Sequence, residues 1–207
     1  MVYNNFILRL FLSIIFIFAY LILSFINFEY VFYLIFFIYI LILVEIYLYF
    51  KIYKSLPLIY VTISFIFFLI IDFNNQITLN FNLFILIVIS FDIFSYIIGK
   101  LFGKIKLTKI SPNKTYEGLF GGSLLSLFCS LLFSYLFKIN INIELIILIF
   151  IFISSAFIGD LVESFFKRKN NIKNSSNFIP GHGGVFDRFD SFLFSIIIYS
   201  ISVYILV

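Results

Sequence analysis

Acidic residues stand at helical spacing with a hydroxyl group and cations in the last quarter of the chain. Asp160, Ser164 and Lys167 occupy positions i, i+4 and i+7, so a helix would project a carboxylate, a hydroxyl and an ammonium group along one face. Asp187 and Asp190 are three residues apart and would share one face of a following helix. We interpret these groups as the candidate reaction centre.

The residues between these acidic groups are rich in cations and glycine. The cations are Lys167, Arg168, Lys169, Lys173 and Arg188, and the glycine-rich turn is Pro180-Gly181-His182-Gly183-Gly184. Mg²⁺ prefers hard oxygen ligands and often binds through one or two carboxylates plus substrate phosphates. Lysine and arginine bind the remaining phosphate oxygens, and backbone N–H groups at glycine can approach an anion closely. The segment therefore predicts a site for a metal–nucleotide complex and a lipid phosphate.

His182 is the only histidine of the chain, so a zinc site built on two histidines is excluded. We interpret it as either a hydrogen-bonding residue of the glycine turn or a base. The single cysteine, Cys129, excludes a disulfide within the chain. The sequence also contains no Walker A motif and no GxSxG motif, which excludes the common soluble nucleotide-binding and hydrolase frameworks.

A second group of polar residues lies inside an apolar run. Asp92, Ser95, Tyr96 and Gly99 fall on one helical face. A carboxylate is costly in lipid, so this face should point into the protein or into a wet cavity, and intramembrane acids are functional candidates. The alternative is a buried carboxyl group that only packs the bundle. Glu45 lies in another apolar run without such neighbours, and packing and function are equally good interpretations of it.

The segment from Ser111 to Glu117 is a third candidate. Ser-Pro favours a turn, and Thr115 is a good N-cap for a following helix. Lys114 and the free N–H groups of a helix start would suit a phosphate. The alternative interpretation is a plain loop-to-helix entry followed by a glycine face for helix packing.

Composition places the chain in a membrane. Of its 207 residues, 63% are hydrophobic and only 12% are charged, too few to cover a soluble core of that size. Seven apolar segments are long enough to cross a bilayer, and helices satisfy their backbone groups there. They are approximately 6–26, 30–50, 57–73, 81–98, 117–137, 142–163 and 191–207. We expect one all-α transmembrane domain over 1–207, with the first segment retained as a span and not cleaved as a signal peptide.

The cations predict the orientation of this bundle. Thirteen of the 14 lysines and arginines fall on one side of an alternating seven-span path, and only Lys138 falls on the other. By the positive-inside rule the N-terminus is expected in the cytoplasm and the C-terminus outside. Loops 99–116 and 164–190 then face the cytoplasm. The net charge of +4 is explained by orientation, so no nucleic-acid partner is expected. Binding of anionic headgroups would account for the cations, but not for the three aspartates or the glycine turn.

The motifs, taken together, resemble a known family. The run from Ser164-Phe165-Phe166-Lys167-Arg168 through Lys173 to Pro180-Gly181-His182-Gly183-Gly184-Val185-Phe186-Asp187-Arg188-Phe189-Asp190 closely resembles the signature of phosphatidate cytidylyltransferases, or CDP-diacylglycerol synthases. Upstream pieces agree in order: Asp92, Tyr96 and Gly99, then Phe102-Gly103-Lys104, Ser111-Pro112, Lys114-Thr115, Glu117-Gly118 and Gly159-Asp160. The resemblance covers about the C-terminal half, 81–207. The family usually has aspartate where Asn174 stands.

The resemblance implies condensation of CTP with phosphatidic acid to CDP-diacylglycerol and pyrophosphate, with Mg²⁺ as cofactor and a second cation such as K⁺ as an addition. It implies Asp160, Asp187 and Asp190 as metal ligands, and Ser164, Lys167 and Arg188 as further catalytic positions. The substrate-binding residues expected on this basis are Asp92, Lys114, Glu117, Arg168, Lys173, His182, Gly183 and Gly184. The expected location is a bacterial-type inner membrane with the site facing the cytoplasm, among membrane lipids, and a homodimer is an open alternative.

Two other functions remain open on the sequence. A CTP-dependent polyprenol kinase of the dolichol kinase type has a similar glycine–aspartate signature and would release CDP. A transporter or a non-catalytic membrane protein could keep the same fold, with Asp92 and Glu45 lining an ion path.

Overall fold

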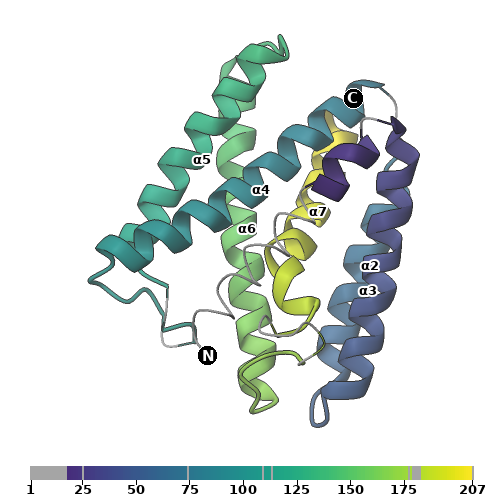
Figure 1. Ribbon diagram of the computed structural model, residues 1–207, viewed down its shortest axis with the longest axis vertical. Helices are drawn as coiled ribbons and strands as arrows, with labels where there is room; N and C mark the ends of the chain where they lie inside the picture. The colour runs from purple at the N-terminus through teal and green to yellow at the C-terminus, as the bar shows by residue number, and fades with distance from the viewer. Residues whose placement is uncertain are drawn as a thin grey trace. The chain divides into compact units, whose positions relative to one another are not determined.

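The computed structural model describes residues 18–24, 26–73, 75–108, 110–112, 114–176, 178 and 183–206. Within these ranges the named elements are all helices (Figure 1): α2 (Phe28–Tyr49), α3 (Ser55–Ile70), α4 (Asn75–Phe102), α5 (Tyr116–Leu136), α6 (Ile143–Lys169) and α7 (Phe186–Leu206). Lys106 and Thr115 form an isolated bridge. The predicted all-α class is confirmed.

The helices agree with the apolar segments expected from the sequence. Four of them, α2, α4, α5 and α6, are long and apolar enough to cross a membrane, and α3 is a shorter apolar helix of 16 residues. The expected first span, 6–26, lies mostly outside the described residues. The chain is therefore a multi-pass integral membrane protein, in which the orientation of the termini stays a prediction.

Two helices are longer than their apolar runs. α4 extends from Asn75 to Phe102, and α6 continues to Lys169. Helical hydrogen bonding continues into polar sequence, because only the lipid requires apolar side chains, and the glutamate, lysine and arginine at the end of α6 are good helix formers. The expected loops 99–116 and 164–190 are accordingly shorter, 103–115 and 170–185. Ser164, Lys167 and Arg168 are helical residues and not loop residues.

The chain divides into two compact units, one with residues 1–62 and 169–189, the other with residues 63–168 and 190–207. In the second unit α4 and α5 pack along a seam of small residues. The buried residues of α5 recur every four positions: Gly118, Gly122, Ser126, Ser130 and Ser134. The Ser90 and Ser126 hydroxyls are 2.9 Å apart, and a Cβ at Gly122 would clash with the Ser95 backbone. Small residues permit such close backbone approach between membrane helices.

An aromatic cluster joins α4, α6 and α7 within the same unit. The Phe84 ring centroid lies 5.3 Å from that of Phe152 and 4.7 Å from that of Tyr199. The Tyr199 hydroxyl donates to the Ile77 carbonyl at 3.0 Å, which satisfies its polar end. All four residues are buried. This cluster holds the three helices together about two helical turns from Asp92, Asp160 and Asp190.

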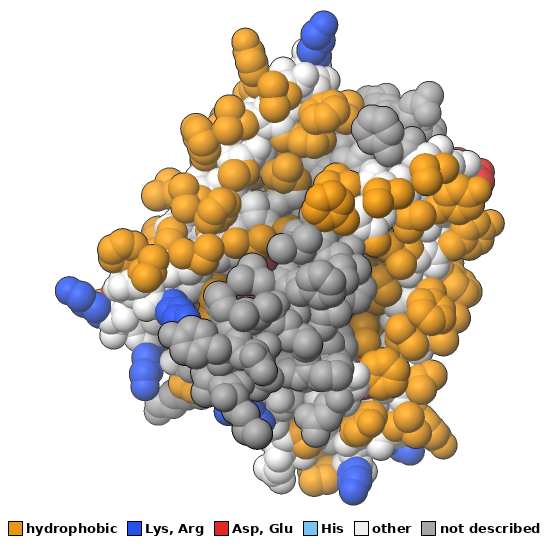
Figure 2. Space-filling model, viewed as in Figure 1, with side chains coloured by type: hydrophobic (Ala, Val, Ile, Leu, Met, Phe, Trp, Pro, Cys, Tyr) orange, Lys and Arg blue, Asp and Glu red, His pale blue; other side chains and the backbone are white. Residues whose placement is uncertain are grey.

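The surface of the described residues is that of a membrane protein. Figure 2 shows hydrophobic side chains over most of the visible described face, with lysine and arginine in a few places at its margins. Phe120, Tyr135 and Leu136 of α5 are exposed by 68%, 75% and 71%. Large apolar groups so exposed are unfavourable in water and suit lipid contact.

Candidate functional site

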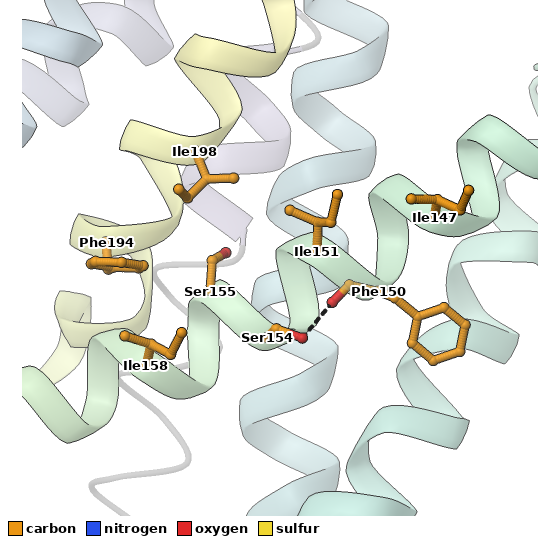
Figure 3. Close-up of a pocket in the computed structure, with 8 residues that line it drawn as sticks. All are labelled: Ile147, Phe150, Ile151, Ser154, Ser155, Ile158, Phe194 and Ile198. Atoms are coloured by element: carbon orange, nitrogen blue, oxygen red, sulfur yellow. Dashed lines mark hydrogen bonds between the residues drawn. The ribbon is translucent and has the colours of Figure 1, made fainter.

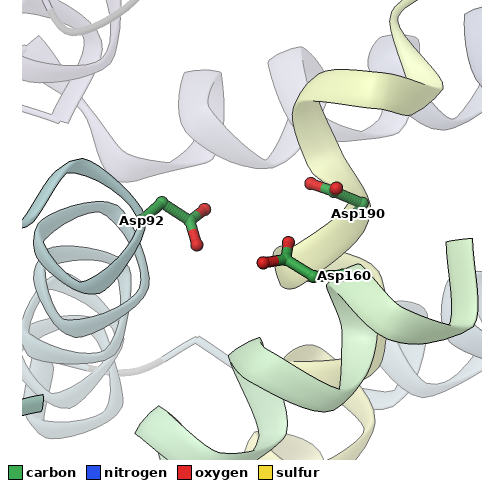
Figure 4. Close-up of side chains that lie close together, drawn as sticks. All are labelled: Asp92, Asp160 and Asp190. Atoms are coloured by element: carbon green, nitrogen blue, oxygen red, sulfur yellow. The ribbon is translucent and has the colours of Figure 1, made fainter. Parts of the chain in front are cut away.

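Three aspartates from three helices of the second unit converge on one point. Asp92 of α4, Asp160 of α6 and Asp190 of α7 each place a carboxylate oxygen within 4.8 Å of the others (Figure 4). We call them the carboxylate cluster. Sequence reasoning predicted Asp160 and Asp190 as metal ligands and placed Asp92 among substrate-binding residues. The structure brings Asp92 into the same cluster.

Ser191 connects two of these carboxylates. Its hydroxyl lies 2.8 Å from Asp92 Oδ1 and 2.5 Å from Asp160 Oδ1. One hydroxyl proton can serve only one of these two acceptors. The remaining close oxygen–oxygen approach requires a proton or a cation to offset repulsion between lone pairs and between carboxylate charges. The cluster therefore contains more hard oxygen acceptors than protons to share between them. Such a set of oxygens fits a small divalent cation such as Mg²⁺.

The close approach of α6 and α7 depends on Gly159. A Cβ at this position would lie 2.6 Å from the Asp190 carbonyl oxygen and 3.1 Å from both Ser191 Cα and Phe194 Cβ. These are contacts with backbone or with the root of a side chain, which cannot rotate away. Glycine therefore lets the two helices meet at the level of Asp160 and Asp190.

Lys114 binds the cluster from the loop 103–115. Its ammonium group forms an ion pair with Asp160 Oδ2 and lies 5.3 Å from the Phe157 ring centroid. Burial lowers the pKa of Lys114, while the Asp190 and Asp92 carboxylates act in the opposite direction. The cation predicted to bind phosphate thus lies directly against the carboxylate cluster.

The loop that carries Lys114 is held by backbone contacts. Leu107 N donates to the Lys114 carbonyl at 2.8 Å, and Tyr116 N donates to the Ile105 carbonyl at 3.1 Å. The Thr115 side chain accepts from Gly118 N at 3.1 Å, which confirms the predicted N-cap. Both Glu117 oxygens lie near Ile105 N, at 3.2 and 3.3 Å. Glu117, which was predicted to bind substrate, holds the start of this loop to the start of α5 through Ile105 N.

The end of α6 carries a second set of charges. Lys167 Nζ lies 2.6 Å from Glu163 Oε2, and Glu163 is fully buried. Arg168 is exposed, and its Nε donates to the Ile110 carbonyl at 3.3 Å, which ties α6 to the Lys114 loop. Ser164 is buried with 9% exposure. The predicted helical face of Asp160, Ser164 and Lys167 therefore exists.

The first unit contains the glycine turn and Asp187. Asp187 Oδ2 accepts from Ser175 N and Gly184 N, both at 2.9 Å. Gly183 has a φ of +89°, a conformation that favours glycine. Lys173 and Arg188 are exposed in this unit. His182 lies outside the described residues, as do Pro180 and Gly181.

The three carboxylates of the cluster do not include Asp187, which belongs to the first unit. Its role as a metal ligand stays a prediction, and the structure shows it accepting from the backbone of Ser175 and Gly184. Sequence reasoning missed Ser191 and Glu163. Glu163 offered one signal, because it stands four residues before Lys167. Ser191 offered none besides following Asp190.

A groove of about 490 Å³ also runs along α6 and α7 (Figure 3). Its lining includes Ile151, Ile158 and Phe194, and its two serines are the polar exceptions. Asp160 lies two positions after Ile158, about 200° around the helix, so groove and cluster lie on different faces of α6. The groove suits hydrocarbon and offers little to a phosphate.

Comparison with known proteins gives the family of the chain. Residues 1–206 match the cytidylyltransferase family. The phosphatidate cytidylyltransferase of Bacillus subtilis (strain 168) is 39% identical over 143 residues, which cover 68% of this chain and 53% of that protein. Those of Staphylococcus epidermidis (strain ATCC 12228 / FDA PCI 1200) and Staphylococcus aureus (strain COL) are each 45% identical over 111 residues, covering 53% of this chain and 43% of theirs.

The chain thus spans about half the length of the curated relatives it matches. The match to the family extends over nearly every residue, and it includes the three helices that bring the carboxylate cluster together. This chain belongs to the cytidylyltransferase family.

Proposed function

We propose that the chain catalyses the condensation of CTP with phosphatidic acid, giving CDP-diacylglycerol and pyrophosphate. The observation that carries the proposal is the convergence of Asp92, Asp160 and Asp190 from three helices in a chain of this family. A lipid phosphate oxygen attacks the α-phosphorus of CTP, and pyrophosphate leaves in line. Such transfer depends on positioning and on charge stabilisation more than on a covalent nucleophile.

Mg²⁺ is the proposed cofactor, held by Asp160 and Asp190 with Asp92 beside them. A bound divalent ion offsets the negative charge of the nucleotide phosphates and of the pyrophosphate leaving group. Ser191 orients two of the carboxylates through its contacts with Asp92 and Asp160. A further contribution from Asp187, and a second cation such as K⁺, stay predictions.

Cations of the chain supply the phosphate contacts. Lys114, at the cluster, is the nearest candidate for a nucleotide phosphate, because exchanging its Asp160 contact for a phosphate oxygen conserves an ion pair. Roles for Arg168, Lys173 and Arg188 at the other phosphates stay predictions, and Lys167 is positioned by Glu163. By the positive-inside rule, the basic loops of the chain support a reaction on the cytoplasmic side of a bacterial-type inner membrane. Assembly into a homodimer stays a prediction.

The experiment that tests the function uses CTP labelled at either end. Purified protein in detergent is given phosphatidic acid, Mg²⁺ and CTP carrying ³²P at the α or the γ position. Cytidylyl transfer moves only the α label into extractable lipid and releases pyrophosphate. A polyprenol kinase, given polyprenol, would instead move only the γ label and release CDP.

Matched variants locate the activity. Asp160→Asn is expected to abolish transfer of the α label, because it removes a carboxylate charge from the cluster at nearly constant volume. Asp72→Asn makes the same change at an exposed aspartate outside the cluster and should leave activity unchanged. Full activity in Asp160→Asn, or no label in lipid from the unaltered protein, contradicts the proposal. Ion flux through liposomes in place of transfer would favour the transporter alternative.

A further inference from the structure

Glu45 is a buried acid of the first unit that none of the chemistry above uses. It lies near the C-terminal end of α2, a helix otherwise apolar around it, and is 3% exposed. Burying a carboxyl group away from water costs several kcal/mol unless strong hydrogen bonds compensate it. A residue needed only to fill this space would be apolar, so its contacts decide what it does.

The Glu45 carboxyl group binds the first N–H groups of α7. Its Oε2 accepts from Val185 N at 2.7 Å and from Phe186 N at 3.2 Å, and α7 begins at Phe186. The first N–H groups of a helix have no partner within the helix, and serine, threonine, aspartate or asparagine usually supplies one from the N-cap position. Val185 stands there and has no side-chain acceptor. Glu45 supplies the missing acceptor from another helix, at the end of α7 where the helix dipole favours negative charge.

The other oxygen of Glu45 meets the glycine turn. A Cβ at Gly184 would clash with Glu45 Oε1 and with Ser175 Oγ, so glycine is required for the turn to approach the carboxyl group. Glu45 Oε1 and Ser175 Oγ are both buried and lack a hydrogen-bond partner within the described residues. The Glu45 carboxyl group therefore holds backbone in place, although its other oxygen is buried without a partner, which costs stability. This pattern is more typical of functional positions than of packing.

Two carboxyl groups accept hydrogen bonds from the backbone around the start of α7. Asp187 accepts from Ser175 N and Gly184 N, and Glu45 accepts from the next two residues, Val185 and Phe186. Phe186 also packs edge-on against Phe50, with ring centroids 6.0 Å apart. Four backbone N–H groups are thus bound by two acids. The N-terminus of α7 cannot shift without breaking the Glu45 contacts.

We propose that Glu45 is a positioning residue which, from α2, caps the N-terminus of α7 and so sets the placement of Asp187 on its first turn. The proposal rests on the proposed function, because Asp187 is a predicted metal ligand whose placement matters there. Asp187 follows Phe186 by one residue. Metal and phosphate ligands tolerate displacements of only about 0.5 Å, so a small movement of this helix start lowers turnover.

The kinetic test compares three variants of Glu45 with one matched control. Glu45→Leu keeps approximate volume and removes the acceptor, and Glu45→Asp withdraws the carboxyl group by one methylene. Both are expected to lower kcat about 100-fold and to raise the Mg²⁺ concentration for half-maximal rate about tenfold, the range found when groups that orient ligands are removed. Glu45→Gln keeps an acceptor at the same reach and should stay within about threefold of the unaltered protein. Glu29→Leu makes the same change at an exposed position of α2 and should have no effect.

A second measurement needs no substrate. Ser176 is 6% exposed and follows Ser175, whose backbone N–H binds Asp187. A cysteine placed there by Ser176→Cys, in protein whose Cys129 is replaced by serine, reacts with a charged maleimide when the backbone opens. The labelling rate therefore reports this opening. Glu45→Leu and Glu45→Asp should raise this rate at least tenfold, while Glu45→Gln and Glu29→Leu should not.

The kinetic and labelling measurements distinguish failure of this proposal from failure of the proposed function. Unchanged kcat and Mg²⁺ requirement in folded Glu45→Leu and Glu45→Asp protein overturn the proposal, as does an unchanged labelling rate in both. Glu45→Asp keeps the test decisive where Glu45→Leu fails to fold. An inactive unaltered protein overturns the proposed function, and the labelling rates then still decide whether Glu45 holds the start of α7.

Discussion

Replacing Gly159 with alanine tests whether the seam between α6 and α7 sets metal affinity. The new Cβ would lie 2.6 Å from the Asp190 carbonyl oxygen and 3.1 Å from Ser191 Cα and Phe194 Cβ. Favourable contacts between such atoms lie at about 3.5 Å or more. Neither backbone atom can rotate away, so the two helices must separate by roughly 0.5 to 1 Å at this level.

That separation moves Asp160 away from Asp190 and Ser191. Ligand distances in metal sites are held to about 0.2 Å, so the displacement is several times the tolerance. We expect the affinity for Mg²⁺ to fall about 10- to 100-fold, as it does when groups that orient metal ligands are lost. This corresponds to about 1.4 to 2.8 kcal/mol of binding free energy. Overpacking should also lower the free energy of unfolding by about 1 to 3 kcal/mol.

Two measurements report how tightly the protein binds Mg²⁺. The Mg²⁺ dependence of α-label transfer gives the concentration for half-maximal rate, and thermal unfolding with and without Mg²⁺ reports binding apart from turnover. Gly121→Ala is the matched control for overpacking at another seam, because the three atoms nearest its new Cβ all belong to Ile98 of α4 and none to the carboxylate cluster. That variant should keep the Mg²⁺ dependence of the unaltered protein within about twofold.

An unchanged Mg²⁺ midpoint in folded Gly159→Ala protein would refute the reasoning. It would mean that the spacing of α6 and α7 does not determine how Asp160 and Asp190 bind the ion, and that the convergence of these residues is structural.

Four other outcomes are expected. Asp187→Asn keeps an acceptor for the glycine turn but loses charge, so activity should be abolished if Asp187 binds metal; near-normal activity in Asp187→Asn, with loss in Asp187→Ala, would assign it to the turn alone. Ser191→Ala should raise the Mg²⁺ requirement about tenfold, measured by the same titration, because two carboxylates lose their common contact. Ser126→Leu overpacks the seam of α5 and should lower the free energy of unfolding by about 1 to 3 kcal/mol, read from thermal melting, with little change in Mg²⁺ requirement. Glu117→Ala should raise the KM for CTP more than Glu117→Gln, since only the amide keeps an acceptor for Ile105 N, and equal KM values would contradict its role in closing the loop.

The membrane class, the helices and one cap followed from local sequence. An apolar run of about 20 residues leaves the backbone no alternative to a helix in lipid, so α2, α4, α5 and α6 could be located from composition alone. Thr115 was predictable as an N-cap because capping depends only on a side chain and the next three residues. The ends of α4 and α6 were less predictable, because a helix ends where its hydrogen bonding stops and not where hydropathy changes.

Motif spacing predicted the candidate acids but not how they are grouped. Asp160 and Asp190 were expected in one site, and the structure places them together. Asp187 lies in the other unit and its role as a metal ligand stays a prediction, while Asp92, nearly seventy residues before Asp160 in the chain, joins the cluster. Spacing along one helix says which residues share a face, but not which face of another helix lies opposite.

The sequence by itself determines the helices and their caps, because the lipid environment, helix geometry and capping act over short stretches of chain. The tertiary structure alone decided that the Ser191 hydroxyl lies between Asp92 and Asp160, that Lys114 pairs with Asp160, and that Glu45 accepts from the first N–H groups of α7. Each of these contacts joins residues that are far apart in the sequence, and their distance in space depends on how the helices pack. Gly159 and the serine seam of α5 permit that packing, and only the folded chain shows which acids it brings together.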